Sequence, residues 1–153
     1  VVYFDPGRRF AGGEYERAFK RLTGIDVPKA MIYYALTGTY PTETEMFEKD
    51  SFLLNGKTTI RLQINVRAGM VASDEGFDTI LEMPEVEYVA LYHAPGSEIS
   101  ATGNTHQRYA HIIVVADDSE KLKDAIYQVY DKIRVFDCNG DNMIVSLFDP
   151  ELV

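Results

Sequence analysis

The stretch T-I-R-L-Q-I-N-V-R at residues 59–67 alternates strictly between apolar and polar side chains. Its apolar members fall on one face of an extended chain: Ile60, Leu62, Ile64 and Val66. A period of two over this length is typical of an antiparallel strand with one buried face. Residues 108–116 are instead nearly all apolar, which predicts a central strand covered on both faces. We therefore expect a sheet built around these two segments.

Turn signals divide the rest of this region into shorter elements. Asp74, Gly76, Pro84 and the Pro95-Gly96 pair predict separate strands at 69–72, 77–81 and 88–93. Ser119 is expected to cap a helix over residues 120–133, because the apolar residues that follow it have helical spacing. This stripe comprises Leu122, Ala125, Ile126, Val129, Tyr130 and Ile133. The Asn139-Gly140 pair predicts a hairpin between strands at 135–136 and 143–147.

The N-terminal part predicts two consecutive helices. The first spans residues 14–23 and ends at Gly24, with one apolar face formed by Tyr15, Ala18, Phe19 and Leu22. The second begins at an Asp26 N-cap, has Pro28 in its first turn and ends near Gly38. Four of its residues are expected to point inward: Ala30, Met31, Tyr34 and Ala35.

Together these elements predict the fold class α+β. Two N-terminal helices follow a short strand, and a mainly antiparallel sheet then carries one long helix. The change in character after the acidic connector at 42–57 predicts two units, residues 1–57 and 58–153.

Composition excludes several functional classes. The chain has 153 residues and a net charge of −9 from 24 acidic and 15 basic residues, which argues against nucleic acid as a partner. No apolar run reaches the roughly 20 residues that span a bilayer, so we expect no membrane partner. The single cysteine, Cys138, cannot form an internal disulfide and fits a cytoplasmic localisation.

The strongest functional candidate is the opening sequence V-V-Y-F-D-P-G-R-R-F, residues 1–10. Asp5 supplies a hard oxygen ligand for Mg²⁺, and Arg8 and Arg9 supply guanidinium groups for a carboxylate or phosphate. Asp-Pro-Gly is also an ordinary turn. The basic residues that follow on the first helix are also explained by a solvated helix face: Arg17, Lys20 and Arg21.

A second candidate is a polar loop before the apolar strand, which we expect to contact substrate. Glycine allows the backbone to approach a ligand closely, and polar side chains surround it. The loop comprises Thr102, Gly103, Asn104 and Thr105. The alternative is a plain connection between two strands.

Other reactive side chains give weaker signals. His93, His106 and His111 lack metal-ligand spacing, and His111 is expected to be a satisfied core or sheet-edge residue. Cys138 lies between acidic residues, which would raise its pKa and disfavour a catalytic thiolate.

Several motifs in order resemble the end of the ATP-grasp fold. The opening D-P-G-R-R at 5–9 is followed by T-G-I-D-V at 23–27 and A-L-T-G at 35–38. The later segments P-G-S-E-I-S-A-T-G-N-T at 95–105 and V-F-D-C-N-G-D-N-M at 135–143 resemble the C-terminal domain of biotin carboxylase-like enzymes. The superfamily also includes the large subunit of carbamoyl phosphate synthetase.

This resemblance implies ATP and Mg²⁺ as cofactors. By it, Asp5 binds the metal, Arg8 contacts the cofactor, and Arg8 and Arg9 act at the catalytic centre. The sequence departs from the family pattern at Tyr3, where a metal-binding glutamate is usual, and at Gly7, where the first arginine is usual.

The resemblance also implies a function and partners. The chain is expected to be the C-terminal fragment of an ATP-dependent carboxylate–amine ligase, not catalytically complete alone. Its expected partners are the N-terminal ATP-grasp lobes of the same polypeptide, a small carboxylate substrate and a second copy in a homodimer. The alternative is a non-catalytic binding or dimerisation module.

Overall fold

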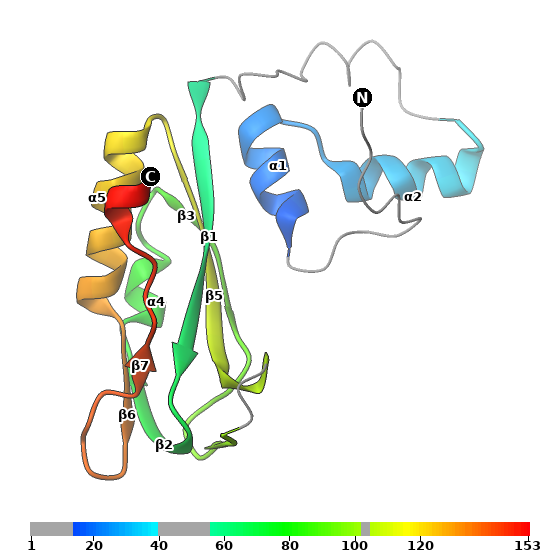
Figure 1. The fold of residues 1–153 in the computed structure, drawn as a ribbon. Coiled ribbons are helices and arrows are strands. Elements are labelled where there is room, and N and C mark those ends of the chain that lie inside the picture. The colour runs from blue at the N-terminus through cyan, green and yellow to red at the C-terminus, as the bar shows by residue number, and fades with distance from the viewer. Residues whose placement is uncertain (1–13, 40–55, 102–104) are drawn as a thin grey trace.

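The computed structural model describes residues 14–39, 56–101 and 105–153. In these ranges the chain is α+β, as predicted, and a four-stranded sheet lies between helix α5 (Ser119–Lys132) and helix α1 (Tyr15–Thr23) (Figure 1). A smaller three-stranded sheet lies beside it. The short strand expected at the N-terminus falls outside the described residues.

The strands form two antiparallel sheets. The order in the larger sheet is β3-β5-β1-β7, and the order in the smaller is β4-β2-β6. Their bounds are β1 Thr58–Val66, β2 Gly69–Glu75, β3 Val86–Leu91, β4 Glu98–Ile99, β5 Arg108–Ala116, β6 Arg134–Asp137 and β7 Ile144–Val145. The remaining elements are α2 (Val27–Thr37), α4 (Phe77–Ile80) and two short 3-10 helices, η2 (Thr105–Gln107) and η3 (Pro150–Leu152).

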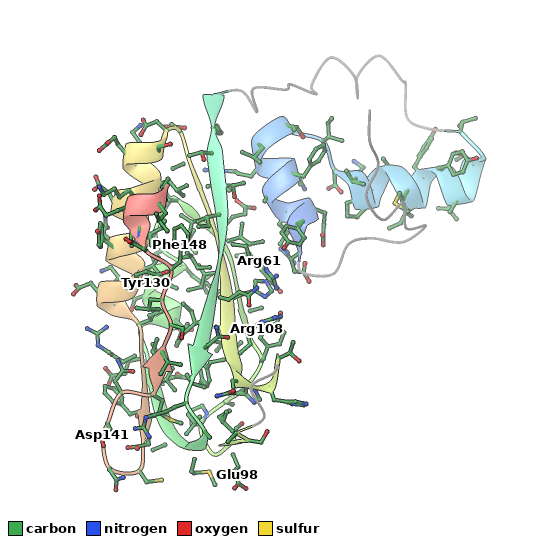
Figure 2. All side chains as sticks on the ribbon, in the orientation of Figure 1. Arg61, Glu98, Arg108, Tyr130, Asp141 and Phe148 are labelled. Carbon is green, nitrogen blue, oxygen red and sulfur yellow. The ribbon has the colours of Figure 1, made fainter. Side chains whose placement is uncertain are left out.

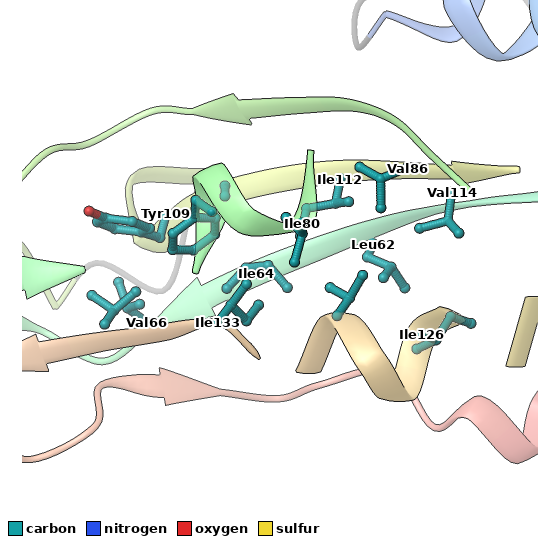
Figure 3. Packing of buried hydrophobic residues seen from close by; sticks show 14 of the residues in the cluster. Leu62, Ile64, Val66, Ile80, Val86, Tyr109, Ile112, Val114, Ile126 and Ile133 are labelled. Atoms are coloured by element: carbon teal, nitrogen blue, oxygen red, sulfur yellow. The ribbon is translucent and has the colours of Figure 1, made fainter. Parts of the chain in front are cut away.

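The two segments that the sequence places at the centre of the sheet pair with each other. β1 and β5 run antiparallel from Thr58 opposite Ala116 to Ile64 opposite Ala110. The apolar face of β1 packs with Ala110, Ile112, Val114 and Ala116 of β5 against α5 and α4 (Figure 3). Residues of this core include Leu62, Ile64, Val66, Ile80, Ile112, Val114, Ile126 and Ile133. The prediction of a half-buried strand and a central strand is confirmed.

A β-bulge interrupts this pairing near the end of β1. Ile64 lies opposite Ala110, but Asn65 lies opposite Arg108, so Tyr109 has no partner on β1. Tyr109 is fully buried in the core. The extra residue returns Arg108 to the sheet face that carries His111, because the face alternates on either side of the bulge.

Helix α5 covers one face of the sheet with the predicted stripe. Leu122, Ala125, Ile126 and Val129 are buried. The N-cap, however, is Asp118 and not Ser119: the Asp118 carboxylate accepts a hydrogen bond from the Lys121 backbone N–H at 2.8 Å. Both residue types cap helices well, so the pattern alone could not choose between them.

The two N-terminal helices have the predicted ends. Gly24 and Gly38 close α1 and α2 with φ of +78° and +73°, and Asp26 caps α2. The expected inward face of α2 is wrong, because Ala30 is buried while Met31, Tyr34 and Ala35 are exposed. This helix is apolar on nearly all sides, so its periodicity does not define a buried face.

Two of the predicted short elements differ from the structure. Residues 77–81 were expected to form a strand, but Phe77–Ile80 form the short helix α4, whose first and last residues are both buried. β2 extends to Glu75, so the turn begins only at Gly76, where φ is +82°. Four residues are too few to distinguish a helical period from a strand period.

The turn at Asn139-Gly140 forms, but it does not join two strands of one sheet. The Gly140 N–H donates to the Asp137 carbonyl at 3.0 Å, and Phe136 forms an isolated bridge with Asn142. β6 then pairs with β2, whereas β7 pairs with β1. The hairpin turn therefore connects the two sheets.

None of the helices in residues 14–39, 56–101 and 105–153 has both the length and the apolar character needed to cross a membrane.

Candidate functional site

Most of the residues that sequence reasoning selected lie outside the described residues. These are Asp5, Arg8, Arg9, Thr102, Gly103 and Asn104. Thr105 is described: it is exposed and begins η2, directly before β5. The structure therefore places one predicted site residue, just before the first residue of β5.

The sheet face opposite α5 carries a group of polar and aromatic side chains. Figure 2 shows Arg61 and Arg108 on the α1 side of the sheet, away from Tyr130 and Phe148, which lie near α5. We define the His111 cluster as five residues of this face: Arg61 on β1, Arg108 and His111 on β5, and Tyr88 and Tyr92 on or directly after β3. The bulge in the β1–β5 pairing is what brings Arg108 into this group.

His111 is at the centre of the cluster and is only 2% exposed. Ala90 lies opposite it on β3, and the small side chain leaves room for rings on either side. The Tyr88 and Tyr92 ring centroids lie 5.6 Å and 5.5 Å from the His111 ring centroid. The Tyr92 hydroxyl lies 2.7 Å from His111 Nδ1, and Arg61 Nη2 lies 3.2 Å from the same atom.

Both arginines of the cluster contact aromatic rings. The Arg108 guanidinium lies 5.7 Å from the centre of the Tyr92 ring, and that of Arg61 lies 5.4 Å from the Tyr15 ring of α1. Arg61 Nη1 also approaches the Tyr15 hydroxyl at 3.5 Å. Such contacts hold the guanidinium planes in place but supply no negative charge.

The surroundings of His111 disfavour its protonated form. Burial lowers the pKa of His111, and the positive charges of Arg61 and Arg108 lower it further. Glu14 at the start of α1 acts weakly in the opposite direction. The Glu14 carboxylate is itself held by Arg17 at 3.0 Å, and the hydrogen bond from Arg17 lowers the pKa of Glu14. His111 is therefore neutral at pH 7.

Two hollows open beside the cluster, and both are lined by Thr105 and Arg108. The first, of about 400 Å³, also contacts Gln63 and Asn65 of β1. The second, of about 450 Å³, also contacts Tyr92 and His93. Thr105, the predicted substrate-contacting residue, is therefore close to the Arg108 side of the cluster.

A third hollow, of about 530 Å³, lies along α1 and contains the described part of the N-terminal basic group. Its cations already pair with carboxylates: Arg17 with Glu14 at 3.0 Å, Lys20 with Asp26 at 2.8 Å, and Arg21 with Glu87 at 3.8 Å. This pairing supports the interpretation of these cations as a solvated helix face.

Metal ligands do not gather in the part of the chain that the structure describes. There, no three residues among His, Cys, Asp and Glu lie close enough together to hold a metal ion. Asp5, the predicted Mg²⁺ ligand, is outside that part. Cys138 is an exposed free thiol in the turn after β6.

Comparison with known proteins found one matching family model. Residues 63–136 match the family model of L-amino acid ligase C-terminal domain 2. The match covers just under half of the chain. It includes Arg108, His111 and Thr105, which lines both hollows beside the cluster.

A solved structure has a similar fold over a longer range. The crystal structure of L-amino acid ligase from Bacillus licheniformis matches with a TM-score of 0.59 and 17% sequence identity. The similarity covers 77% of this chain but 28% of that one. No curated protein matches. The similarity concerns the fold, and the expected α+β class is confirmed.

Sequence reasoning missed the His111 cluster for identifiable reasons. The outward residues of β1 were recognised as polar, but nothing in the pattern placed Arg61 beside a histidine 50 residues later. His111 was expected to be a satisfied core or sheet-edge residue. It is buried on an inner strand and its Nδ1 has partners, but its Nε2 has no hydrogen-bond partner among the described residues.

Proposed function

We propose that this chain is the C-terminal part of an ATP-dependent ligase that joins a carboxylate to an amine, with amino acids as the substrate class. The observation that carries the proposal is the match of residues 63–136 to the L-amino acid ligase domain model. The similar fold of the Bacillus licheniformis L-amino acid ligase supports it. The finer likeness to biotin carboxylase and carbamoyl phosphate synthetase rests on the sequence motifs alone.

In this proposal the chain works together with further lobes of a longer polypeptide. It spans 28% of the matched ligase structure, which supports this. Helix α2 also exposes large apolar side chains, with Ile32 at 62% and Leu36 at 82%. Exposed apolar surface of this kind is typical of a face that packs against another domain.

The cofactor roles come from the resemblance to ATP-grasp enzymes. ATP with Mg²⁺ would activate the carboxylate as an acyl phosphate. Asp5 would bind the metal, and Arg8 and Arg9 would contact phosphate or the substrate carboxylate. Residues 58–153 would form the β-rich domain beside that site. A cytoplasmic localisation belongs to the same proposal.

The test is ATP-dependent phosphate release by the longer polypeptide, assayed with Mg²⁺ and pairs of amino acids. We expect release that depends on both an amino acid and ATP. Absence of release with every amino acid tested would overturn the proposal. Asp5→Ala should abolish release, whereas the matched control Asp131→Ala, which removes an exposed carboxylate of α5, should not.

The second candidate function is a non-catalytic binding or dimerisation module, and the same exposed face of α2 favours it. In that case α2 would pack against a second copy of the chain. Light scattering of the chain and of an Ile32→Asp variant distinguishes the two functions. Loss of a dimer in the variant, with no amino-acid-dependent ATP turnover by the longer polypeptide, would favour the module.

A further inference from the structure

Three buried nitrogen atoms in the His111 cluster have no hydrogen-bond partner. They are Arg61 Nε, Arg108 Nε and His111 Nε2. Among the described residues, no other buried side-chain nitrogen or oxygen atom lacks a hydrogen-bond partner. All three belong to one face of one sheet, and buried polar atoms are rarely left unpaired in folded proteins.

All three atoms are donors. An arginine Nε always carries a hydrogen and accepts nothing. The His111 proton follows from its neighbours: Arg61 Nη2 can only donate, and it lies 3.2 Å from Nδ1. Nδ1 must therefore accept, so the proton of the neutral ring is on Nε2. The cluster thus presents three N–H groups that lack an acceptor.

The two guanidinium groups also lack a carboxylate partner, unlike three of the other described arginines. Arg17, Arg21 and Arg67 each pair with a carboxylate. Arg134 donates to the backbone carbonyls of Tyr130 and Ile133. Within the described ranges no carboxylate lies within 4.0 Å of Arg61 or Arg108. Their side chains contact His111 and the tyrosines Tyr15 and Tyr92 instead.

This arrangement is costly for the protein when nothing is bound. A buried donor without an acceptor is destabilising, and a charged one more so. The two guanidinium charges also lack a carboxylate partner among the described residues. A negatively charged group with oxygen acceptors would offset both costs at once, through charge-assisted hydrogen bonds.

Space for such a group exists next to the cluster. Arg108 lines two hollows of about 400 and 450 Å³, whose other polar side chains include Gln63, Asn65 and Thr105. Either hollow can hold a small anion against the Arg108 guanidinium, which is the member of the three that lines them.

We propose that the face formed by Arg61, Arg108 and His111 is a binding site for a small oxyanion, either a carboxylate or a phosphate. Its oxygens accept hydrogen bonds from the Arg108 guanidinium in a hollow that Arg108 lines, and the positive charge of Arg61 on the same sheet face attracts the same anion. This goes beyond the proposed ligase function, since anion binding is measurable without turnover. It also does not involve Asp5, Arg8 or Arg9.

The experiment is an NMR titration of the full chain that follows the imidazole signals of His111. Inorganic phosphate and acetate are added in separate arms, and a sodium chloride arm matches the ionic strength. A saturable shift of the His111 signals in the phosphate or acetate arm, absent with chloride, is expected. The arm with the tighter Kd identifies which of the two anion chemistries the site prefers.

Variants assign the binding to the cluster. Arg108→Gln should weaken anion binding by about tenfold or more, because it removes a charge-assisted hydrogen bond. Arg61→Gln should weaken it less, because it removes only a nearby positive charge. The matched control Arg21→Gln, which loses the same charge from an exposed position on α1, should bind as the unmodified chain does. Arg108→Lys, which keeps the charge, serves if a glutamine variant does not fold.

Two results would overturn the proposal. One is a His111 signal that does not respond to phosphate or acetate beyond the chloride arm. The other is equal weakening in Arg21→Gln and Arg108→Gln, which would mean that the anion responds to overall charge and not to this face. Failure of ATP turnover in the longer polypeptide would leave the binding result intact, so the two proposals are separable.

Discussion

The buried hydroxyl of Tyr109 on β5 donates a hydrogen bond to the carboxylate of Asp74 on β2, and this contact joins the two sheets. Burial, together with the negative charge of Asp74, raises the pKa of Tyr109, so the hydroxyl stays protonated and continues to donate. The bulge that leaves Tyr109 without a partner on β1 is what allows its ring to turn into the core.

We expect Tyr109→Phe to lower the free energy of unfolding by about 1–3 kcal/mol, because Asp74 loses its donor while the ring stays packed. Chemical denaturation measures the loss. Tyr127→Phe is the matched control, since its exposed hydroxyl also donates to a carboxylate, that of Glu151. The control should lose much less stability, because water replaces an exposed hydrogen bond. Equal losses would show that the Tyr109 contact does not hold the sheets together.

Gly76 allows α4 to pack against the end of α5. Its φ is +82°, and a Cβ at this position would lie 2.1 Å from the backbone carbonyl oxygen of Lys132. We expect Gly76→Ala to destabilise the protein by more than about 1 kcal/mol, because strain and a clash with backbone act together. Thermal denaturation measures the change.

Gly140→Ala separates the two causes. Gly140 has the same φ of +82°, but nothing lies within 4 Å of its missing Cβ. The control should therefore show only the cost of the left-handed backbone. If both variants lose the same stability, the close approach of α5 is not what requires glycine at position 76.

The elements predicted well from sequence are those whose signal is repeated over many residues. β1 shows alternation over its whole length, and α5 combines a helical stripe with an acidic N-cap. α4 was missed because four residues give no period. The inward face of α2 was misjudged because a helix that is apolar on all sides has no preferred face.

The His111 cluster was beyond sequence reasoning for a different reason. Its members come from three strands, and their approach depends on strand order and on a one-residue bulge. Alternation predicts which side chains share a face of one strand, but it does not predict which strands are neighbours. Thr105 was selected from the polar character of its loop, and it does lie beside Arg108.

The lowered pKa of His111 predicts a dependence of stability on pH. The folded protein resists protonation of this ring, whereas the unfolded chain takes up the proton near the ordinary pKa of 6.5. The unfolded state therefore binds more protons between these two pKa values, and the free energy of unfolding falls as the pH decreases below about 6.5. The slope for one proton is at most about 1.4 kcal/mol per pH unit.

Urea denaturation at several pH values from about 7.5 to about 5 measures this loss of unfolding free energy. The range brackets the ordinary histidine pKa of about 6.5. His111→Gln should flatten the profile, while His106→Gln, at an exposed position of η2, should keep it. Carboxylates whose pKa is lowered, such as Asp137 beside Arg67, have an ordinary pKa of 3.8. Their effect on the free energy of unfolding therefore falls at a lower pH than that of His111. A profile that stays steep in His111→Gln would contradict the prediction.

The exposed face of α2 leads to a prediction that compares two leucines of the N-terminal helices. Leu22 of α1 is 6% exposed and packs with Ala18 against Ile113 and Val115 of the sheet, whereas Leu36 of α2 is 82% exposed. We expect Leu22→Ala to cost about 2–4 kcal/mol in this chain, because it leaves a cavity at the helix–sheet contact. Leu36→Ala should change stability by less than about 0.5 kcal/mol.

The same pair of variants in the longer polypeptide tests whether α2 packs against another lobe. If α2 packs against another lobe, Leu36→Ala should become destabilising there, because the side chain is then buried. Chemical denaturation of both lengths gives the comparison, with Leu22→Ala as the internal reference that should cost the same in each. Leu36→Ala and Leu22→Ala could instead destabilise the short chain equally. The face of α2 would then already be packed, and it would no longer support a partner lobe.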